Sequence, residues 1–578
     1  MIINIVFFYF LFLFFAGPSL LLSQATAIPP IHSGSILFVQ PKGEIIEVAQ
    51  QTSMIQQLVL GSSNQFPVSA IVDSIKAAAY DRRISALVFD FSNMSSLSLS
   101  IAFEINSAIQ EFTEQGKPYY AFSTDYTIPK YLLASSATAI GLDPFGDIDF
   151  SGLSVETTFL GGVPEKTGIT FEVSKAGTHK GAADTYIQKQ FTNEVRTNYT
   201  EVLGEYWEYF ISQCSKNRKI DKNNIEQYAK TPLAVLKNTS GNIGEALLQL
   251  NLVDSISTYR DFLRNHKVSE SLVIPCQDFY RTIPLKKSNN EICLISLNGA
   301  ISQTGSPVQY SDMAISSDLC AKIQQACDSP NVRAIVLRID SGGGEVFASE
   351  LIRRKVKQAS SEYNIPVVVS MSNTAASGAY WIASSADYIF ANPFTLTGSI
   401  GVLSSIVNVG QALEKYLGIT SDMVYAARKP LSVFQEMLDE EKELQQLQVD
   451  FIYNQFLQIV STGRKLAIDE VAEKASGKIY SGNQALNNGL VDELGTLQDA
   501  ISFASRLAGI ENDFILTSIE KEKTVLESIF EFALNNSISI SDIPILKSLC
   551  EVESLMQAIT IQGRKSLLVY EPFRLRQF

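Results

Sequence analysis

The chain carries one sequence pattern twice, and the two copies lie about 249 residues apart. YLLASSA at 131–137 is matched by YWIASSA at 380–386, and LNLVDSI at 250–256 is matched by NGLVDEL at 488–494. Because related sequences fold alike, this repeat predicts two domains of one fold in a chain of 578 residues.

Within each copy, short apolar stretches alternate with stretches of helical periodicity. The strand-like stretches lie at 35–40, 86–91 and 118–122 in the first copy, and at 292–297, 334–339 and 367–371 in the second. Strands that alternate with amphipathic helices are typical of βαβ units around a mostly parallel sheet. The sequence therefore predicts the α/β class, with tandem βαβ domains.

The repeat also sets the expected domain boundaries. We expect a first domain over 30–259 and a second over 291–510, joined by a connection over 260–290, where periodicity is lost. Residues 511–578 have no evident counterpart in the first copy, so we expect them to form a C-terminal extension. Within it, Val525 to Leu534 have the pattern of an amphipathic helix.

An apolar leader opens the chain. Residues 1–22 are almost unbroken apolar sequence, long enough to cross a hydrocarbon core of ~30 Å as a helix. Ala25-Thr26-Ala27 has the form of a cleavage site, so residues 1–28 predict either a retained membrane anchor or a signal peptide. In both cases the two domains are expected on the exported, periplasm-like side of a membrane.

Charge and cysteine content exclude two classes of partner. The formal net charge is −14 and the chain has no long basic run, which argues against a nucleic-acid surface. Its six cysteines form no CxxC pair and have no metal-ligand spacing with the three histidines. We therefore expect neither nucleic acid nor a metal or other cofactor.

The two copies differ where chemistry is expected. The second copy has Gly342-Gly343-Gly344 after an apolar strand, where the first has Met94-Ser95-Ser96. Glycines at a strand end let backbone N–H groups of Gly343 and Gly344 point at a developing oxyanion. Ser377 follows the next strand, in a small-residue setting at a helix start, which suits a nucleophile, and the N–H of Gly378 is a further oxyanion donor.

A serine nucleophile needs a base, and the first copy offers two adjacent candidates, His179 and Lys180. The second copy has Leu431 near the corresponding place. A lysine acts as a base only when neutral, so its pKa must fall from ~10.4 by about three units, a shift that desolvation can supply. We therefore expect the second copy to supply a nucleophile with an anion pocket, and the first copy to supply a base.

A linked series of motifs comprises GTHKGAADTY, NGAI at 298–301, AIVLRIDSGGGEVFASE, the run from Pro366 to Leu403, and GLVDELG at 489–495. This series resembles the signal peptide peptidase A family, also called protease IV, in its long two-domain form. It extends from about residue 35 to about residue 510. One departure is Gly342, where the family generally has proline.

The resemblance implies a Ser-Lys dyad, with Ser377 as nucleophile and Lys180 as base, and Ser399 as the residue that orients the lysine. It also implies a crotonase-like or Clp-protease-like fold in each domain, four identical subunits, and a membrane-associated endopeptidase that degrades cleaved signal peptides. Two alternatives stay open. One is an acyl-CoA hydratase or isomerase of the crotonase fold, and the other is an inactive membrane scaffold.

Overall fold

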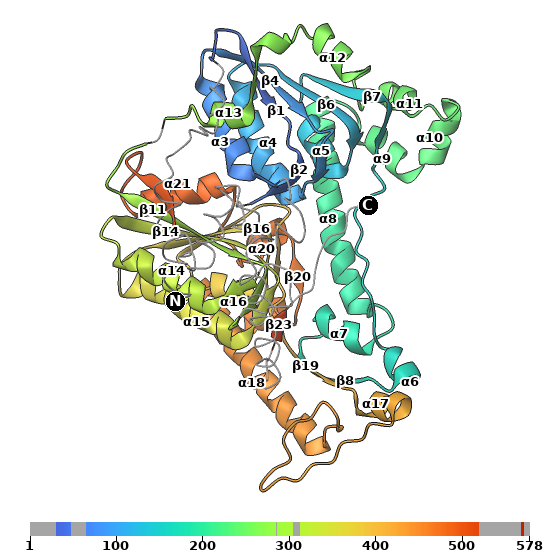
Figure 1. Ribbon diagram of the computed structural model, residues 1–578, viewed down its shortest axis with the longest axis vertical. Helices are drawn as coiled ribbons and strands as arrows, with labels where there is room; N and C mark the ends of the chain where they lie inside the picture. Colours follow the sequence, from blue (N-terminus) through green and yellow to red (C-terminus); the bar gives the residue numbers. More distant parts are fainter. Residues whose placement is uncertain (1–29, 48–64, 285, 305–312, 520–567, 571–578) are drawn as a thin grey trace, which may run out of the picture.

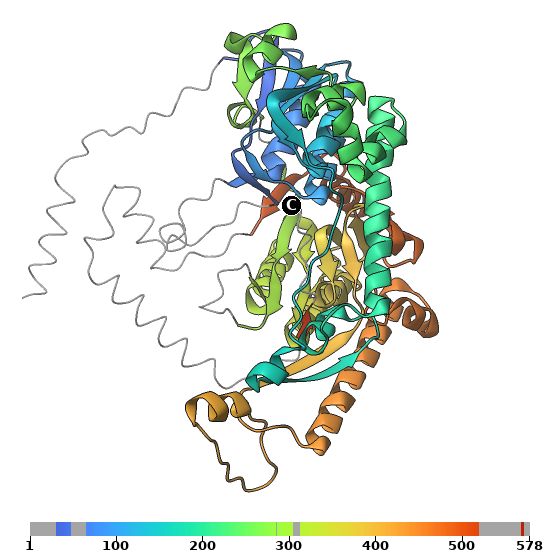
Figure 2. The same ribbon diagram turned by 90° about the vertical axis from the view of Figure 1, so that its right-hand side faces the viewer.

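The computed structural model describes residues 30–47, 65–284, 286–304, 313–519 and 568–570. Two α/β bodies lie one above the other, and helix α8 (Asn193–Arg218) runs from the first body along the side of the second (Figures 1 and 2). The apolar leader and the predicted helix over 525–534 lie outside the described residues. Among the helices that are described, none combines the length and apolarity needed to cross a bilayer.

The first copy forms a six-stranded sheet in which every neighbouring pair is parallel. Its spatial order is β10 (Val273–Pro275), β1 (Ser35–Val39), β4 (Ile84–Asp90), β6 (Tyr119–Tyr126), β7 (Ala139–Ile148) and β9 (Ser255–Ile256). Helices α3 (Val68–Tyr80), α4 (Leu99–Glu114) and α5 (Ile128–Ala134) connect these strands.

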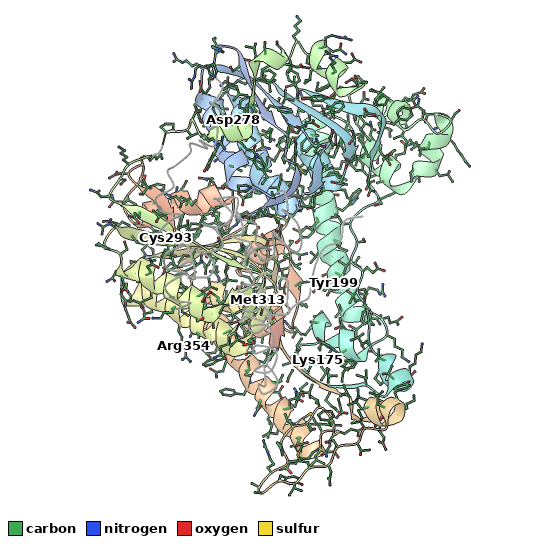
Figure 3. The ribbon with its side chains drawn as sticks, viewed as in Figure 1. Lys175, Tyr199, Asp278, Cys293, Met313 and Arg354 are labelled. Atoms are coloured by element: carbon green, nitrogen blue, oxygen red, sulfur yellow. The ribbon has the colours of Figure 1, made fainter. Side chains whose placement is uncertain are left out.

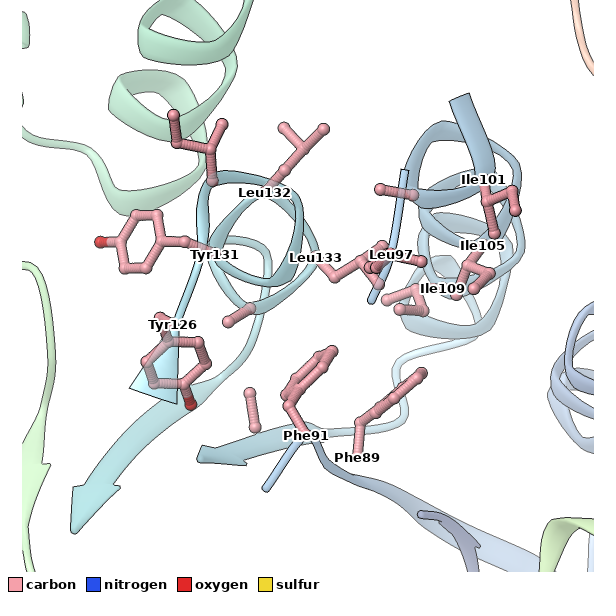
Figure 4. Close-up of a cluster of buried hydrophobic side chains, with 14 of the residues drawn as sticks. Phe89, Phe91, Leu97, Ile101, Ile105, Ile109, Tyr126, Tyr131, Leu132 and Leu133 are labelled. Atoms are coloured by element: carbon pink, nitrogen blue, oxygen red, sulfur yellow. The ribbon is translucent and has the colours of Figure 1, made fainter. Parts of the chain in front are cut away.

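Helix α4 shows how sequence pattern produces this packing. Ser98 caps its N-terminus by accepting a hydrogen bond from the Ile101 N–H at 3.2 Å. Ile101, Ile105 and Ile109 then recur every four residues and face the core, where they lie near Phe89 and Phe91 at the end of β4 (Figure 4). Burying one such side chain contributes roughly 1.5–3 kcal/mol.

The second copy repeats this sheet. Strands β22 (Ile515–Ser518), β11 (Glu291–Asn298), β14 (Val332–Ser341), β16 (Val367–Ala376), β17 (Tyr388–Ala391) and β21 (Glu493–Leu494) pair in that order, all parallel. Beyond Ser370, β16 pairs instead with β18 (Leu396–Gly398), which pairs with β20 (Ile479–Tyr480). The predicted tandem α/β fold is confirmed.

The sequence motifs shared by both copies make the same structural contacts in each. The tyrosine of each Tyr-x-x-Ala-Ser-Ser-Ala motif donates its hydroxyl to a leucine carbonyl, and the aspartate of each Leu-Val-Asp motif binds an arginine at the end of a 26-residue helix. The partners are Tyr131 with Leu252, Tyr380 with Leu490, Asp254 with Arg218, and Asp492 with Arg464. These shared residues therefore support the fold.

Two expected boundaries need correction. The stretch 260–290, predicted as a connection, contains β10 and α13 (Cys276–Tyr280), and β10 extends the first sheet beside β1. The stretch after 510, expected to lack a counterpart, contains β22, which takes the place beside β11 that β10 takes beside β1. Both are edge strands of three or four residues, too short for alternating side chains to reveal them.

A further sheet joins the two copies. Strand β8 (Thr170–Ala176) of the first copy pairs antiparallel with β19 (Val402–Asn408) of the second along its whole length, from Thr170 opposite Asn408 to Ala176 opposite Val402. In the same sheet, β13 (Met313–Ile315), β12 (Ala300–Ser302) and β15 (Gly343–Glu345) follow each other. Their first-copy counterparts β3 (Gln65–Pro67), β2 (Gly43–Ile46) and β5 (Met94–Ser96) form a small sheet of their own.

Candidate active site

The loop that carries Lys180 begins where β8 ends, and it lies directly on the second copy. Gly177 has φ +114°, and a methyl group there would lie 2.7 Å from the Ser476 carbonyl carbon. Gly477 has φ +79°, and a methyl group there would lie 2.6 Å from the Lys180 nitrogen. Two glycines facing each other thus allow the backbones to touch, and the His179 N–H donates to the Ser476 carbonyl at 2.8 Å.

Helix α8 holds the same region from the other side. The Asn198 side chain donates to the Ile479 carbonyl and accepts from the Ile479 N–H, both at 2.9 Å. Figure 3 shows Tyr199 on α8 and Lys175 on β8, on the side of the molecule where the first copy reaches along the second. Neither Asn198 nor the Ser476-Gly477 turn stands out in the sequence, because their partners lie far away along the chain.

Ser377 occupies a strained turn between β16 and helix α16 (Gly378–Ala383). Its backbone has φ +58° and ψ −119°, a combination that residues other than glycine rarely adopt. The Ser377 N–H donates to the Gly398 carbonyl of β18 at 2.8 Å, and this contact holds the turn. Strain of this kind costs roughly 1–3 kcal/mol and is concentrated at functional sites.

The structure brings Lys180, Ser377 and Ser399 together. Lys180 Nζ lies 2.7 Å from Ser377 Oγ, 2.8 Å from Ser399 Oγ and 3.0 Å from the Ser399 carbonyl oxygen. All three residues are fully buried. Chemically, the arrangement places an amine within proton-transfer distance of an alcohol, with Ser399 holding the amine from a second direction.

His179 lies differently from its neighbour. Its ring nitrogen Nδ1 lies 3.0 Å from Thr178 Oγ1, in a half-exposed position, and burial together with the nearby Lys478 charge lowers the pKa of the imidazole. The acid closest to Lys180 in sequence, Asp184, pairs with Lys175 at 2.5 Å. Of the two candidate bases, the geometry therefore favours Lys180.

The three predicted oxyanion donors are also neighbours. A methyl group on Gly378 would lie 3.1 Å from the Gly344 nitrogen and 2.6 Å from Ser349 Oγ, so Gly378 packs against the glycine strand β15. The Gly343 N–H donates to Ser341 Oγ at 3.1 Å. Gly342, where the family generally has proline, lies between Ser341 and this strand.

In the first copy, the position that corresponds to Ser399 is filled by apolar packing. Phe150, at the place of Ser399, is buried and packs edge-on against Tyr131 and Phe210, with ring centroids 4.9 and 5.4 Å away. The described part of the first copy therefore has an aromatic cluster where the second has polar groups.

Strand β15 also carries a partner from the C-terminal part of the chain. The backbone of β23 (Leu568–Tyr570) pairs antiparallel with β15, with Val569 opposite Gly344, and it also pairs with β19 at Leu403. The edge beside the two glycines thus accepts an extended chain by backbone pairing.

Comparison with known proteins gives matches to a family model, to named relatives and to solved structures. A family model described as Peptidase family S49 matches residues 111–272 and 359–511. "Protease 4" of Haemophilus influenzae is 32% identical over 77% of this chain and 73% of that protein, and "Protease 4" of Salmonella typhi is 31% identical over 80% and 75%. "Serine protease SPPA, chloroplastic" of Arabidopsis thaliana is 26% identical over 84% and 73%. Among solved structures, a ClpP1 mutant from Listeria monocytogenes covers 36% of this chain and 94% of its own, with 15% identity and a TM-score of 0.25.

Proposed function

The chain belongs to peptidase family S49 and is a serine protease, and from this premise we propose that it cleaves peptide bonds with a dyad of Ser377 and Lys180. The observation that carries the proposal is the 2.7 Å separation of Lys180 Nζ and Ser377 Oγ, at full burial, between side chains from different copies of the repeat. Burial away from water disfavours an ammonium, and a neutral amine is the form that a general base requires.

In the proposed mechanism, Lys180 takes the Ser377 proton as Oγ attacks the peptide carbonyl. The neutral amine has two N–H bonds and one lone pair, so it can donate to the Ser399 oxygens while its lone pair faces Ser377. Because the Gly343 N–H already donates to Ser341 Oγ, the N–H groups of Gly344 and Gly378 are the proposed donors that hold the oxyanion. The protonated amine then returns its proton to the leaving nitrogen, and water releases the acyl group.

The proposed substrate is an extended peptide, and its class is the cleaved signal peptide. Support for the extended form comes from β23, whose backbone pairs with β15 beside Gly344. The apolar leader supports a location at a membrane, with the two domains on the exported side. Apolar signal peptides remain in the membrane after cleavage. Membership of a peptidase family disfavours the hydratase alternative.

The proposal extends to assembly of four identical subunits, and the repeat supplies an argument for it. At the repeat distance, the counterparts of β8 and β19 are residues 419–425 and 153–159. Residues 419–425 form no described strand and expose the side chains of Ile419, Val424 and Tyr425. In a head-to-tail assembly, this segment of one subunit pairs with 153–159 of the next, a heterologous contact that closes into a ring.

A labelling experiment tests the dyad. The purified protein is treated with a fluorophosphonate, the adduct is located by peptide mass spectrometry, and cleavage of a signal peptide is followed in parallel. We expect the adduct on Ser377, no cleavage by Ser377→Ala, and a loss of roughly 10²–10⁴-fold for Lys180→Ala. His179→Ala serves as the adjacent control and should keep most of the activity.

Three outcomes would contradict the proposal. Loss of activity in His179→Ala with retention in Lys180→Ala would reassign the base. Cleavage that survives Ser377→Ala would remove the nucleophile. An unlabelled wild-type protein that cleaves nothing would favour the inactive scaffold.

A further inference from the structure

A buried cluster of charges joins the two copies next to the proposed site. Arg338 on β14 is fully buried and forms a two-pronged contact with Glu47, from Nε to Oε2 at 2.9 Å and from Nη2 to Oε1 at 2.7 Å. Its Nη2 also lies 3.1 Å from Glu104 Oε1. Glu47 follows β2 and Glu104 lies on α4, so both carboxylates come from the first copy and the guanidinium from the second.

The same cluster reaches the second strand of the site. Arg338 Nη1 donates to Ser370 Oγ on β16 at 2.7 Å, and the Ser372 hydroxyl on β16 binds Glu47. Asp340, two residues after Arg338 on β14, accepts from Asn373 Nδ2 at 2.7 Å and from the Thr374 N–H at 3.0 Å. Strands β14 and β16 are thus cross-linked at the level where the first copy touches them.

Both strands continue from the cluster into the proposed machinery. Strand β14 ends at Ser341, directly before the glycines, and β16 ends at Ala376, directly before Ser377. A rotation or slip of β14 against β16 would therefore change the distance between the oxyanion donors and the nucleophile. Displacements of about 1 Å at reacting groups cost about 10²-fold in rate.

Stability alone is a poor explanation for such a cluster. Replacing a buried ion pair or triad by apolar side chains of similar volume is often neutral or stabilising, because burying charges costs desolvation energy. What a guanidinium provides instead is direction, since its planar fork fixes the carboxylates and hydroxyls that it binds.

We propose that Arg338 is a positioning residue, which aligns β14 and β16 through Glu47 and Glu104 so that the oxyanion donors and Ser377 reach working geometry only when the first copy is docked. This inference rests on the proposed function of Ser377. Docking of the first copy then has two consequences at one time. It delivers Lys180, and it sets the strands that carry the other half of the site.

The test removes the guanidinium together with the two carboxylates that it binds, and it leaves Asp340 with its hydrogen-bond donors Asn373 and Thr374. The variant Arg338→Met/Glu47→Gln/Glu104→Gln is compared with the wild-type protein in thermal unfolding, peptide cleavage and the rate of fluorophosphonate labelling. We expect kcat and the labelling rate to fall at least tenfold, KM to stay within about twofold, and the unfolding temperature to change little. Arg218→Met/Asp254→Asn is the matched control, because it removes an arginine–aspartate pair whose further hydrogen-bond partners, Asn251 and Ile140, belong to the first copy, and it should keep kcat.

The outcomes separate the inference from the function on which it rests. A triple variant that folds and labels at the wild-type rate would overturn the positioning role while leaving the dyad intact. A wild-type protein that is not labelled would overturn both. If the triple variant fails to fold, Glu47→Gln replaces it, since it keeps Arg338 and Glu104. A fall in kcat at constant KM then supports the role, and an unchanged kcat contradicts it.

Discussion

At the scale of single residues, the site consists of ordinary groups in unusual surroundings. A lysine is normally a solvated surface residue, and a serine at a helix start is normally a cap. Here Lys180 is fully buried with its Nζ between Ser377 and Ser399, and Ser377 has a positive φ. Burial and backbone geometry, not residue type, distinguish them.

Ser399 provides a prediction at this scale. Ser399→Ala removes one acceptor of the Lys180 amine but leaves the Ser399 carbonyl oxygen, 3.0 Å from Nζ, in place. We expect kcat to fall by about tenfold, less than the ~10²–10⁴-fold that a general base contributes. Steady-state cleavage of a signal peptide measures this. A loss as large as that of Lys180→Ala would show that Ser399 does more than orient the amine.

At the scale of secondary-structure elements, the strand β8 and the loop after it deliver the lysine. The antiparallel pairing of β8 with β19 and the contact of Gly177 with the Ser476-Gly477 turn fix where Lys180 lies. The strands of the central sheets were predictable from apolar runs, as with β4, β14 and β16. Strands β10 and β22 were not predictable, because three or four residues are too few to show a repeating pattern of apolar side chains.

Gly177→Ala tests this delivery. The added methyl group would lie 2.7 Å from the Ser476 backbone, so the loop or the Ser476-Gly477 turn must shift, and we expect Lys180 Nζ to move away from Ser377. Gly152→Ala is a matched control, since Gly152 has φ +102° but open space around its Cβ position. Both variants carry a backbone cost of about 1–2 kcal/mol. We expect only Gly177→Ala to lose labelling of Ser377 by at least tenfold, and equal labelling in the two would contradict the assigned role of the loop.

At the scale of the whole molecule, the two copies are held together by a cluster whose charges do not balance. One guanidinium, Arg338, lies between the carboxylates of Glu47 and Glu104, and Asp340 lies nearby. Burial, which outweighs the attraction of Arg338, raises the pKa of Glu104 to about 7, and the Glu47 charge adds to the rise. We therefore expect the junction between the copies to be sensitive to pH.

This gives a stability prediction. Because the folded protein holds a proton on Glu104 that the unfolded chain releases above its ordinary pKa of 4.5, the free energy of unfolding falls as pH rises from about 4.5 to about 7. Glu104→Gln keeps an acceptor for the Leu497 N–H but removes this titration. Relative to wild type, the variant should gain stability across that window, by on the order of 3 kcal/mol in total. Urea unfolding at several pH values measures this, and parallel curves for the two proteins would contradict it.

The sequence by itself determined the repeat, the α/β class and the short set of candidate residues. The α/β class depends on neighbours a few positions apart, whose periodicity and composition are visible in the chain. The candidate residues follow from the comparison of the two copies and from the resemblance to a family. The sequence also separated fold from chemistry, because residues present in both copies, such as Tyr131 and Tyr380, make the same structural contact, and residues present in one copy do not.

Only the tertiary structure decided which of these residues meet. Lys180 lies 197 positions from Ser377 and 219 from Ser399 along the chain, and Arg338 lies 291 from Glu47. No local pattern encodes such distances. The residues alone left His179 and Lys180 as two adjacent candidates, and only the resemblance to a family favoured Lys180, while the buried charge cluster was not visible in the sequence. The place of Lys180 and the charge cluster follow from how two copies of one fold pack against each other, which brings side chains from separate copies into one interior.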